Sequence, residues 1–186
     1  MNIAEAITTR RSVRNYTGQQ VPRLLIEQLL TAAVQAPSAM NSQPWAFSVI
    51  QDKALLKTLS DRAKAHLLTL INDLPAIEKY RGALVSDVFN IFYNASTLLT
   101  IYSRPLDPHP EIDCSLAAQN IMLLAHSLGL GSCWIGFAEP LLKLPEVKKE
   151  LNIPDEYSAV APLILGYPAV LTPALPKKEP EIIFWK

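Results

Sequence analysis

Residues 111–137 read EIDCSLAAQNIMLLAHSLGLGSCWIGF, and this stretch decides the class of fold. Its first part is apolar over the length of a helix, and Gly129 is placed to end that helix. Asp113 and His126 interrupt the apolar run, and such polar groups are costly to place in a bilayer. The stretch therefore predicts a helix over residues 111–128 that is buried in a protein core and does not span a membrane.

Further helices and strands are predicted on both sides of this helix. Helices are expected over residues 2–9, 22–36, 53–71 and 145–151, breaks at residues 72–75 and 104–110, and strands over residues 45–50, 96–102, 132–137 and 158–166. Residues 76–94 are expected to form a short helix or an irregular cover outside the core. Because helices and strands do not alternate regularly, the order indicates an α+β sandwich rather than a series of βαβ units.

The composition excludes several classes of protein. The 186 residues carry no net charge, and the basic residues form no long run, so a surface for nucleic acid or anionic lipid is not expected. Cys114 and Cys133 lack the spacing of a zinc site or of a disulfide framework. We therefore expect no metal site and a cytoplasmic location.

The C-terminal tail from Pro168 is rich in proline, yet it ends in the hydrophobic run Ile182-Ile183-Phe184-Trp185. A run of this kind would be unusual in free contact with water. Hydrophobic residues make up 49% of the chain and charged residues 18%, a balance that also favours burial against a second copy. We expect the tail to dock on a partner subunit in a homodimer.

A short basic segment, Arg10-Arg11-Ser12-Val13-Arg14, directly follows the first predicted helix. Arginine makes bidentate, charge-assisted hydrogen bonds to phosphate, so the segment suits a ligand that carries one. In an extended chain Arg10, Ser12 and Arg14 would share one side. On its own the segment could equally be a solvated basic turn.

The loop Ala36-Pro37-Ser38-Ala39-Met40-Asn41-Ser42-Gln43-Pro44-Trp45 joins a helix to a strand. Its prolines fix the shape of the backbone, and its amide side chains offer paired donors and acceptors to a ligand with an imide-like edge. The loop could therefore form the rim of a binding site. Taken alone it could also be an ordinary helix-to-strand connection.

Both motifs occur, in order, with Gly-Leu-Gly-Ser-Cys-Trp-Ile-Gly at residues 129–136 and Leu-Gly-Tyr-Pro at residues 165–168. In this combination the chain resembles the nitroreductase family over essentially its whole length. The resemblance implies one domain spanning residues 1–186, folded as a three-layer α/β/α sandwich with a mixed, largely antiparallel sheet. It also implies a homodimer with two FMN molecules at the subunit interface, each contacted by both chains.

The same resemblance assigns residues to the cofactor. FMN-binding positions are expected at Arg10, Arg11, Ser12, Arg14, Pro37, Ser38, Ala39, Asn41, Asn90, Trp134, Ile135, Gly136, Lys177 and Lys178. Residues 10–12 and 177–178 match positions around the phosphate, whereas Arg14 and Asn90 match the pyrimidine edge of the flavin. Residues 134–136 match the segment beside the ring, where a backbone N–H can reach N5, and residues 37–41 are expected to come from the other subunit.

The activity that the resemblance implies is transfer of hydride from NADH or NADPH, through the flavin, to small flat acceptors such as nitroaromatics or quinones. No catalytic side chain is expected, because hydride passes directly to and from N5. The chain also lacks a long insertion between Ile71 and Ser96 that could form a substrate lid. An FMN carrier or sensor without efficient turnover, a reductive dehalogenase-type enzyme and a flavin-destroying enzyme remain the alternatives on this scaffold.

Overall fold

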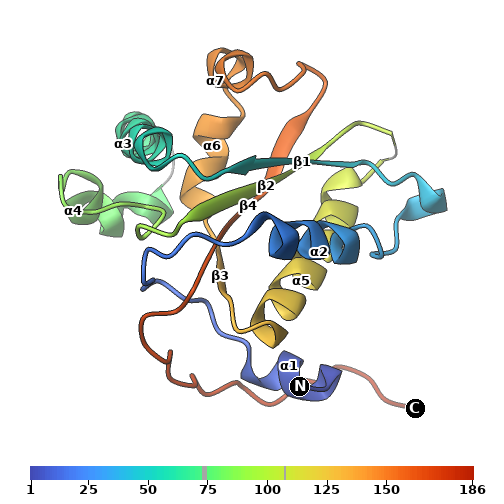
Figure 1. Cartoon of the computed structure of the whole chain (residues 1–186). Coiled ribbons are helices and arrows are strands. Elements are labelled where there is room, and N and C mark those ends of the chain that lie inside the picture. Colours follow the sequence, from blue (N-terminus) through green and yellow to red (C-terminus); the bar gives the residue numbers. More distant parts are fainter. Residues whose placement is uncertain (73–74, 107) are drawn as a thin grey trace.

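A four-stranded antiparallel sheet forms the centre of this computed structural model, which describes residues 1–72, 75–106 and 108–186. The breaks predicted at residues 72–75 and 104–110 fall partly on positions 73, 74 and 107, which lie outside the described residues. The strands are β1 (Trp45–Ile50), β2 (Thr97–Ser103), β3 (Gly131–Trp134) and β4 (Ser158–Gly166). Their order is β1-β2-β4-β3, so β1 and β3 are the two edges (Figure 1).

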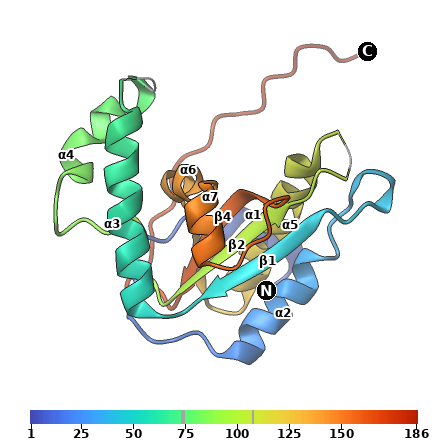
Figure 2. The same cartoon turned by 90° about the horizontal axis from the view of Figure 1, so that it is seen from above.

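Helices cover both faces of the sheet and give the three layers that the sequence predicts. One face packs against α2 (Arg23–Ala33) and α5 (Pro110–Ser127). The other face packs against α3 (Lys53–Leu70), α6 (Glu139–Leu142) and α7 (Pro145–Glu150) (Figure 2). Every residue of β2 is buried because this strand lies between two neighbours and under both layers.

Capping side chains explain where two of the helices begin. At the start of α1 (Ile3–Thr9) the side chain of Asn2 accepts a 2.9 Å hydrogen bond from the N–H of Glu5. At the start of α3 the side chain of Asp52 accepts a 2.8 Å hydrogen bond from the N–H of Leu55. These bonds satisfy N–H groups that have no partner inside a helix. Both starts confirm the sequence prediction.

Helix α5 ends before Gly129 and is buried in the core, and both features were predicted from the sequence. Gly129 lies just after the helix with a φ of +76°, a left-handed conformation that glycine adopts without strain. The helix buries Ala117, Ala118 and Ile121 completely against the sheet and α2. No helix among the described residues is both long and apolar enough to cross a membrane.

Two predicted ends are wrong by three residues each. The second helix ends at Ala33 instead of Ala36, because Pro37 has no N–H to donate and its ring disfavours helical conformation in the residue before it. The third strand ends at Trp134 instead of Phe137, because residues Gly136–Ala138 turn into the short 3-10 helix η3. That turn carries Gly136 and Phe137 off the end of the strand, whereas the N–H of Ile135 still donates to the carbonyl oxygen of Pro162 in β4.

Residues 76–94, which were predicted to cover the core from outside, do so only in their first part. This part of the chain contains the 3-10 helix η2 (Pro75–Tyr80) and the short helix α4 (Arg81–Leu84), which lie beside α3 (Figure 2). Ile91 and Phe92, however, are each only 1% exposed and belong to the core under α3. Their burial comes from a turn without helical or strand periodicity, so the pattern of the sequence did not indicate it.

Candidate functional site

The basic segment at residues 10–14 lies along the outer edge of β3. Ser12 and Ser132 form a parallel bridge, and the N–H of Val13 donates a 3.0 Å hydrogen bond to the carbonyl oxygen of Ser132. The close approach requires Gly131, because a Cβ atom at that position would lie 2.8 Å from Cβ of Val13. The bridge is isolated and lies outside the named strands, and the three pairings within the four-stranded sheet are all antiparallel rather than mixed.

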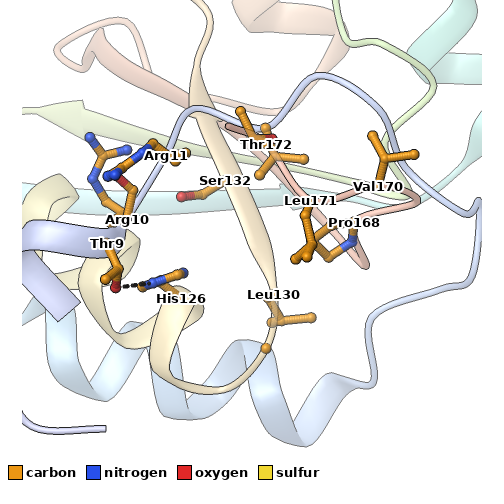
Figure 3. Close-up of a pocket in the computed structure, with 12 residues that line it drawn as sticks. Thr9, Arg10, Arg11, His126, Leu130, Ser132, Pro168, Val170, Leu171 and Thr172 are labelled. Carbon is orange, nitrogen blue, oxygen red and sulfur yellow. Dashed lines mark hydrogen bonds between the residues drawn. The ribbon is translucent and has the colours of Figure 1, made fainter. Parts of the chain in front are cut away.

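A cavity of about 340 Å³ opens at the Arg10 end of the segment (Figure 3). Nη1 of Arg11 is occupied by two 2.8 Å hydrogen bonds to the carbonyl oxygens of Thr8 and Arg10. The guanidinium of Arg10 has no hydrogen bond or ion pair within the described residues. The hydroxyl of Ser132, only 2% exposed as a residue, also finds no partner there. A free cation and an orphan hydroxyl together suit an anionic ligand group.

His126 lines the same cavity, a position that no motif in the sequence predicts for it. Its Nε2 lies 2.8 Å from the hydroxyl of Thr9 (Figure 3). Burial lowers the pKa of His126 below its usual value, and the positive charges of Arg10 and Arg11 lower it further, while Glu5 opposes them. A neutral imidazole is therefore favoured until negative charge enters the cavity.

A second cavity, of about 350 Å³, opens at the Arg14 end of the segment. It is lined by Arg14, Tyr80, Ile91, Tyr93, Trp134, Ile135, Gly136 and Phe137. The guanidinium carbon of Arg14 lies 5.9 Å from the centroid of the Tyr93 ring, within the range of a cation–π contact. The lining is thus aromatic with one cation, a combination suited to a flat ligand that carries or gains negative charge.

Two backbone N–H groups at this second cavity, those of Ile135 and Gly136, differ in whether they already have a hydrogen-bond acceptor. The N–H of Ile135 is occupied by the carbonyl oxygen of Pro162 at 2.8 Å. Gly136 is exposed and is the first residue of η3, so its own N–H is not used inside that short helix. Of the expected ring-side segment, Gly136 is therefore better placed than Ile135 to donate a backbone hydrogen bond to a ligand.

The two cavities lie at opposite ends of one strip. Segment 10–14 and β3 run side by side, with Arg10, Arg11 and Ser132 at one cavity and Arg14 and Trp134 at the other. Five extended residues span roughly 13 Å between their first and last Cα atoms. The strip can hold an elongated ligand with an anionic group at one end and a flat ring at the other.

The loop at residues 37–44 lies elsewhere within the chain. It leads into β1, the edge of the sheet opposite to β3, so Pro37, Ser38, Ala39 and Asn41 are not brought together with Arg14 (Figure 1). Three residues of this loop, Met40, Asn41 and Gln43, have positive φ angles of 51°, 57° and 47°. Strained backbone of this kind is typical of ligand clamps and persists only where neighbouring structure holds it.

The remaining expected positions are not brought to the strip. Lys177 and Lys178 lie exposed on the C-terminal tail, which runs away from the body of the chain (Figure 2). Asn90 is half-buried, and its side-chain oxygen accepts a 2.8 Å hydrogen bond from the N–H of Phe92. Asn90 therefore shapes the turn that carries Ile91 and Tyr93 to the second cavity, and does not line either cavity itself.

Sequence reasoning missed three aromatic residues of the second cavity. Tyr80 and Tyr93 come from the segment whose structure could not be inferred from periodicity, and Phe137 was assigned to a strand. The chain has no long insertion before β2, yet η2 and α4 still supply a wall of this cavity through Tyr80. The only available signal was the density of aromatic residues between positions 80 and 93.

Comparison with known proteins places this geometry in context. The model of the nitroreductase family matches residues 7–167. A provisionally named NADH dehydrogenase/NAD(P)H nitroreductase of Methanothermobacter thermautotrophicus is 33% identical over 172 residues, covering 91% of this chain and 78% of the relative. An FMN reductase (NADPH) of Bacillus subtilis is 30% identical over 187 residues, covering 95% of this chain and 71% of the relative.

A solved structure shares the whole fold. The crystal structure of a nitroreductase with bound FMN from Bacteroides fragilis is similar with a TM-score of 0.86 and 28% sequence identity, over 100% of both chains. A nitroreductase with bound FMN from Desulfitobacterium hafniense has a TM-score of 0.84 and 25% identity, again over 100% of both chains. Both proteins are similar to this chain from end to end.

Proposed function

The chain belongs to the nitroreductase family, and we propose on that premise that it is an FMN-dependent oxidoreductase. It passes hydride from NADH or NADPH to small flat acceptors such as nitroaromatics or quinones. The observation that carries the proposal is the strip along β3, which joins an anion-binding cavity at Arg10 to an aromatic cavity at Arg14. FMN has the matching shape, with a phosphate at one end and a flat ring at the other.

The phosphate end of the proposed site rests on the charges at the first cavity. Arg10 offers a guanidinium that no described residue occupies, and Ser132 offers a buried hydroxyl without a partner. Ser12 lies beside both on the bridged segment. These groups fit a phosphate, which takes several charge-assisted hydrogen bonds at once. Lys177 and Lys178 would join them if the tail folds back when the cofactor binds.

The proposed binding site for the flavin ring is the second cavity. When bound there, FMN supplies a nitrogen, N5, that accepts hydride and later donates it. The exposed guanidinium of Arg14 is placed to stabilise negative charge on the pyrimidine side, and the N–H of Gly136, which no other described residue accepts, can donate to the ring. Ile135 and the aromatic side chains offer an apolar surface on which the ring can pack. For a quinone the overall change is NAD(P)H + H⁺ + quinone → NAD(P)⁺ + hydroquinone, with the proton taken from water.

A second subunit completes the proposed site. Residues 37–41 lie at the edge of the sheet opposite to Arg14, so within one chain they cannot reach the same ligand. In a homodimer this loop, presented with its strained backbone and fully exposed Met40, would close over the cofactor held by the other chain. The exposed hydrophobic end of the tail gives the two chains a further surface to share.

Anaerobic titration of the purified protein tests the proposal. The protein should carry flavin absorbance that is released as FMN, and NADH or NADPH should bleach it. Addition of a quinone or a nitroaromatic should then restore the oxidised spectrum. A flavin that neither nicotinamide reduces would replace this proposal with an FMN carrier or sensor, and absence of bound flavin after reconstitution would overturn cofactor binding itself.

A further inference from the structure

His126 stands half-buried in the last turn of α5, on the wall of the cavity that opens beside Arg10 (Figure 3). Its one hydrogen bond among the described residues joins Nε2 to the hydroxyl of Thr9, at 2.8 Å. This contact ties α1 to α5, since Thr9 is the last residue of α1. It also fixes which nitrogen of the ring carries the hydrogen.

The hydroxyl of Thr9 decides the form of the neutral imidazole. That hydroxyl donates its single hydrogen to the carbonyl oxygen of Glu5, at 2.6 Å. It can therefore only accept from His126, so Nε2 is the nitrogen that carries the hydrogen in the neutral ring. Nδ1 is left with a lone pair and has no hydrogen-bond partner among the described residues. A proton that charges the ring must add at Nδ1.

The charges of the chain itself oppose protonation of His126. Burial lowers its pKa, and Arg10 and Arg11 lower it further from the segment after α1, whereas Glu5 on α1 raises it. The residues that β3 and the segment 168–172 contribute to the cavity are uncharged, and the other ionisable residues of α5 lie near its opposite end. The cavity therefore has an excess of positive charge, which a bound anion would balance.

A phosphate group in this cavity would reverse that balance. The guanidinium of Arg10 and the buried hydroxyl of Ser132 have no partners within the described residues, so both can donate to the phosphate oxygens. The two negative charges of the phosphate would then lie close to His126 and favour its charged form. The place of His126 in the last turn of α5 adds to this effect, because the C-terminal end of a helix favours a cation.

We propose that His126 is an additional cation of the phosphate site, which takes up a proton from solvent at Nδ1 when the phosphate group of FMN enters the cavity. The inference rests on the proposed function, in which this cavity holds the phosphate. Because binding takes up a proton, FMN is held more tightly at lower pH. His126 acts in binding and takes no part in hydride transfer.

Binding of FMN and of riboflavin to the flavin-free protein tests the proton uptake. The two ligands share the ring and the ribityl chain, and only FMN carries the phosphate. Flavin fluorescence gives both dissociation constants between about pH 6.5 and pH 8.5, a range in which the phosphate, with a second pKa of ~6, is largely dianionic. The constant for FMN should rise about threefold or more over this range, whereas that for riboflavin should not change.

His126→Gln keeps a side chain that can donate a hydrogen bond toward Thr9 but that cannot take up a proton. It should bind FMN as tightly as the wild type near pH 8.5 and lose the tighter binding near pH 6.5. Calorimetry in two buffers with different heats of ionisation should show proton uptake in the wild type and none in this variant. His66→Gln, on α3 and outside this cavity, is the matched control and should keep both properties.

Proton NMR of the wild type follows the same event without a substitution. The chain has three histidines, and the ring signals of His126 are identified by their nuclear Overhauser contacts to Thr9. Their titration midpoint should move to higher pH when FMN is added, or when inorganic phosphate is added as a probe of the cavity alone. The midpoints of His66 and His109 should stay unchanged, because neither residue lines the cavity.

An FMN affinity without pH dependence, or a dependence that riboflavin or His126→Gln shares, would overturn the inference and leave His126 with the structural role of joining α1 to α5. Flavin that binds with proton uptake at His126 but that no nicotinamide reduces would overturn the proposed function alone. A protein that binds no FMN would overturn both.

Discussion

The side chain of Asp113 accepts a 3.0 Å hydrogen bond from the backbone N–H of Ala39. Asp113 is buried in the first turn of α5, so the bond ties the helix that anchors the sheet to the loop that precedes β1. Each positive φ angle in that loop costs about 1–3 kcal/mol for a residue other than glycine. The bond to Asp113, with the 3.0 Å bond from Gln43 N–H to the Ser38 hydroxyl, holds the loop in this conformation.

Replacing Asp113 with alanine should release the loop. The N–H of Ala39 would lose its acceptor, and the free energy of unfolding should fall by about 1–3 kcal/mol. Urea denaturation measures the loss, and hydrogen exchange at the Ala39 amide should accelerate at the same time. Asp113→Asn keeps an acceptor oxygen and should lose less. Unchanged exchange at Ala39 in Asp113→Ala would show that the loop is held by other contacts.

Replacing Gly131 with alanine should push the basic segment off the edge of β3. The new Cβ would meet Cβ of Val13 at 2.8 Å, and overpacking of this kind costs about 1–3 kcal/mol. Binding of FMN, followed by flavin fluorescence, should weaken as well, because Arg10 and Arg14 are carried by the displaced segment. Gly82→Ala is the control: beyond its own helical turn, no atom of the described residues lies within 4 Å of the added Cβ, so stability should change by less than about 1 kcal/mol.

Arg10 and Arg14 should differ in what they contribute to the cofactor. Arg10→Ala should weaken FMN binding by about 10- to 100-fold, because it removes a charge-assisted contact to the phosphate. Arg14→Ala should chiefly lower the flavin potential, by about 20 mV for an interaction of ~1 kcal/mol. Equilibrium dialysis and anaerobic redox titration measure the two effects. Equal effects of both variants on affinity and potential would contradict this division.

The stability of the protein without cofactor should depend on the protonation of His126. Because burial and the charges of Arg10 and Arg11 lower its pKa in the folded state, the unfolded chain takes up this proton at a higher pH. The free energy of unfolding should therefore fall as the pH drops through about 6.5, and the loss should be complete below the folded-state pKa.

His126→Gln removes this titrating group, so the midpoint of thermal unfolding should fall less between about pH 8 and pH 5.5 than in the wild type. His66→Gln, at a half-buried position on α3 that does not line the Arg10 cavity, is the control and should keep the wild-type dependence. If His126→Gln follows the wild-type curve over the whole range, the histidine does not control the acid side of the profile.

Removing residues 180–186 should weaken the homodimer that we propose. Ile183, Phe184 and Trp185 are exposed in the isolated chain, and burying one large apolar side chain contributes ~1.5–3 kcal/mol. The dissociation constant should therefore rise by at least about tenfold, as measured by analytical ultracentrifugation. Deleting Lys186 alone should have little effect. A truncated protein that dimerises as tightly as the full chain would place the interface elsewhere.

Local sequence signals predicted the elements that depend on neighbouring residues. Strands β1 and β4 occur at the predicted positions, and Asn2, Asp52 and Gly129 bound their helices as expected. These features follow from hydrogen bonds and backbone preferences within a few residues. Where a distant contact decides the outcome, as for Ile91 and Phe92 in the core, the pattern failed.

By itself the sequence determined the α+β class, the order of its elements and, through four motifs in series, the family to which the chain belongs. Only the tertiary structure decided that residues 10–14 run beside β3, that His126 and Ser132 share a cavity with Arg10, and that Tyr80 faces Phe137. The reason is physical. Capping and periodicity act over one or two helical turns, whereas a site is made by packing residues that the sequence separates by more than fifty positions.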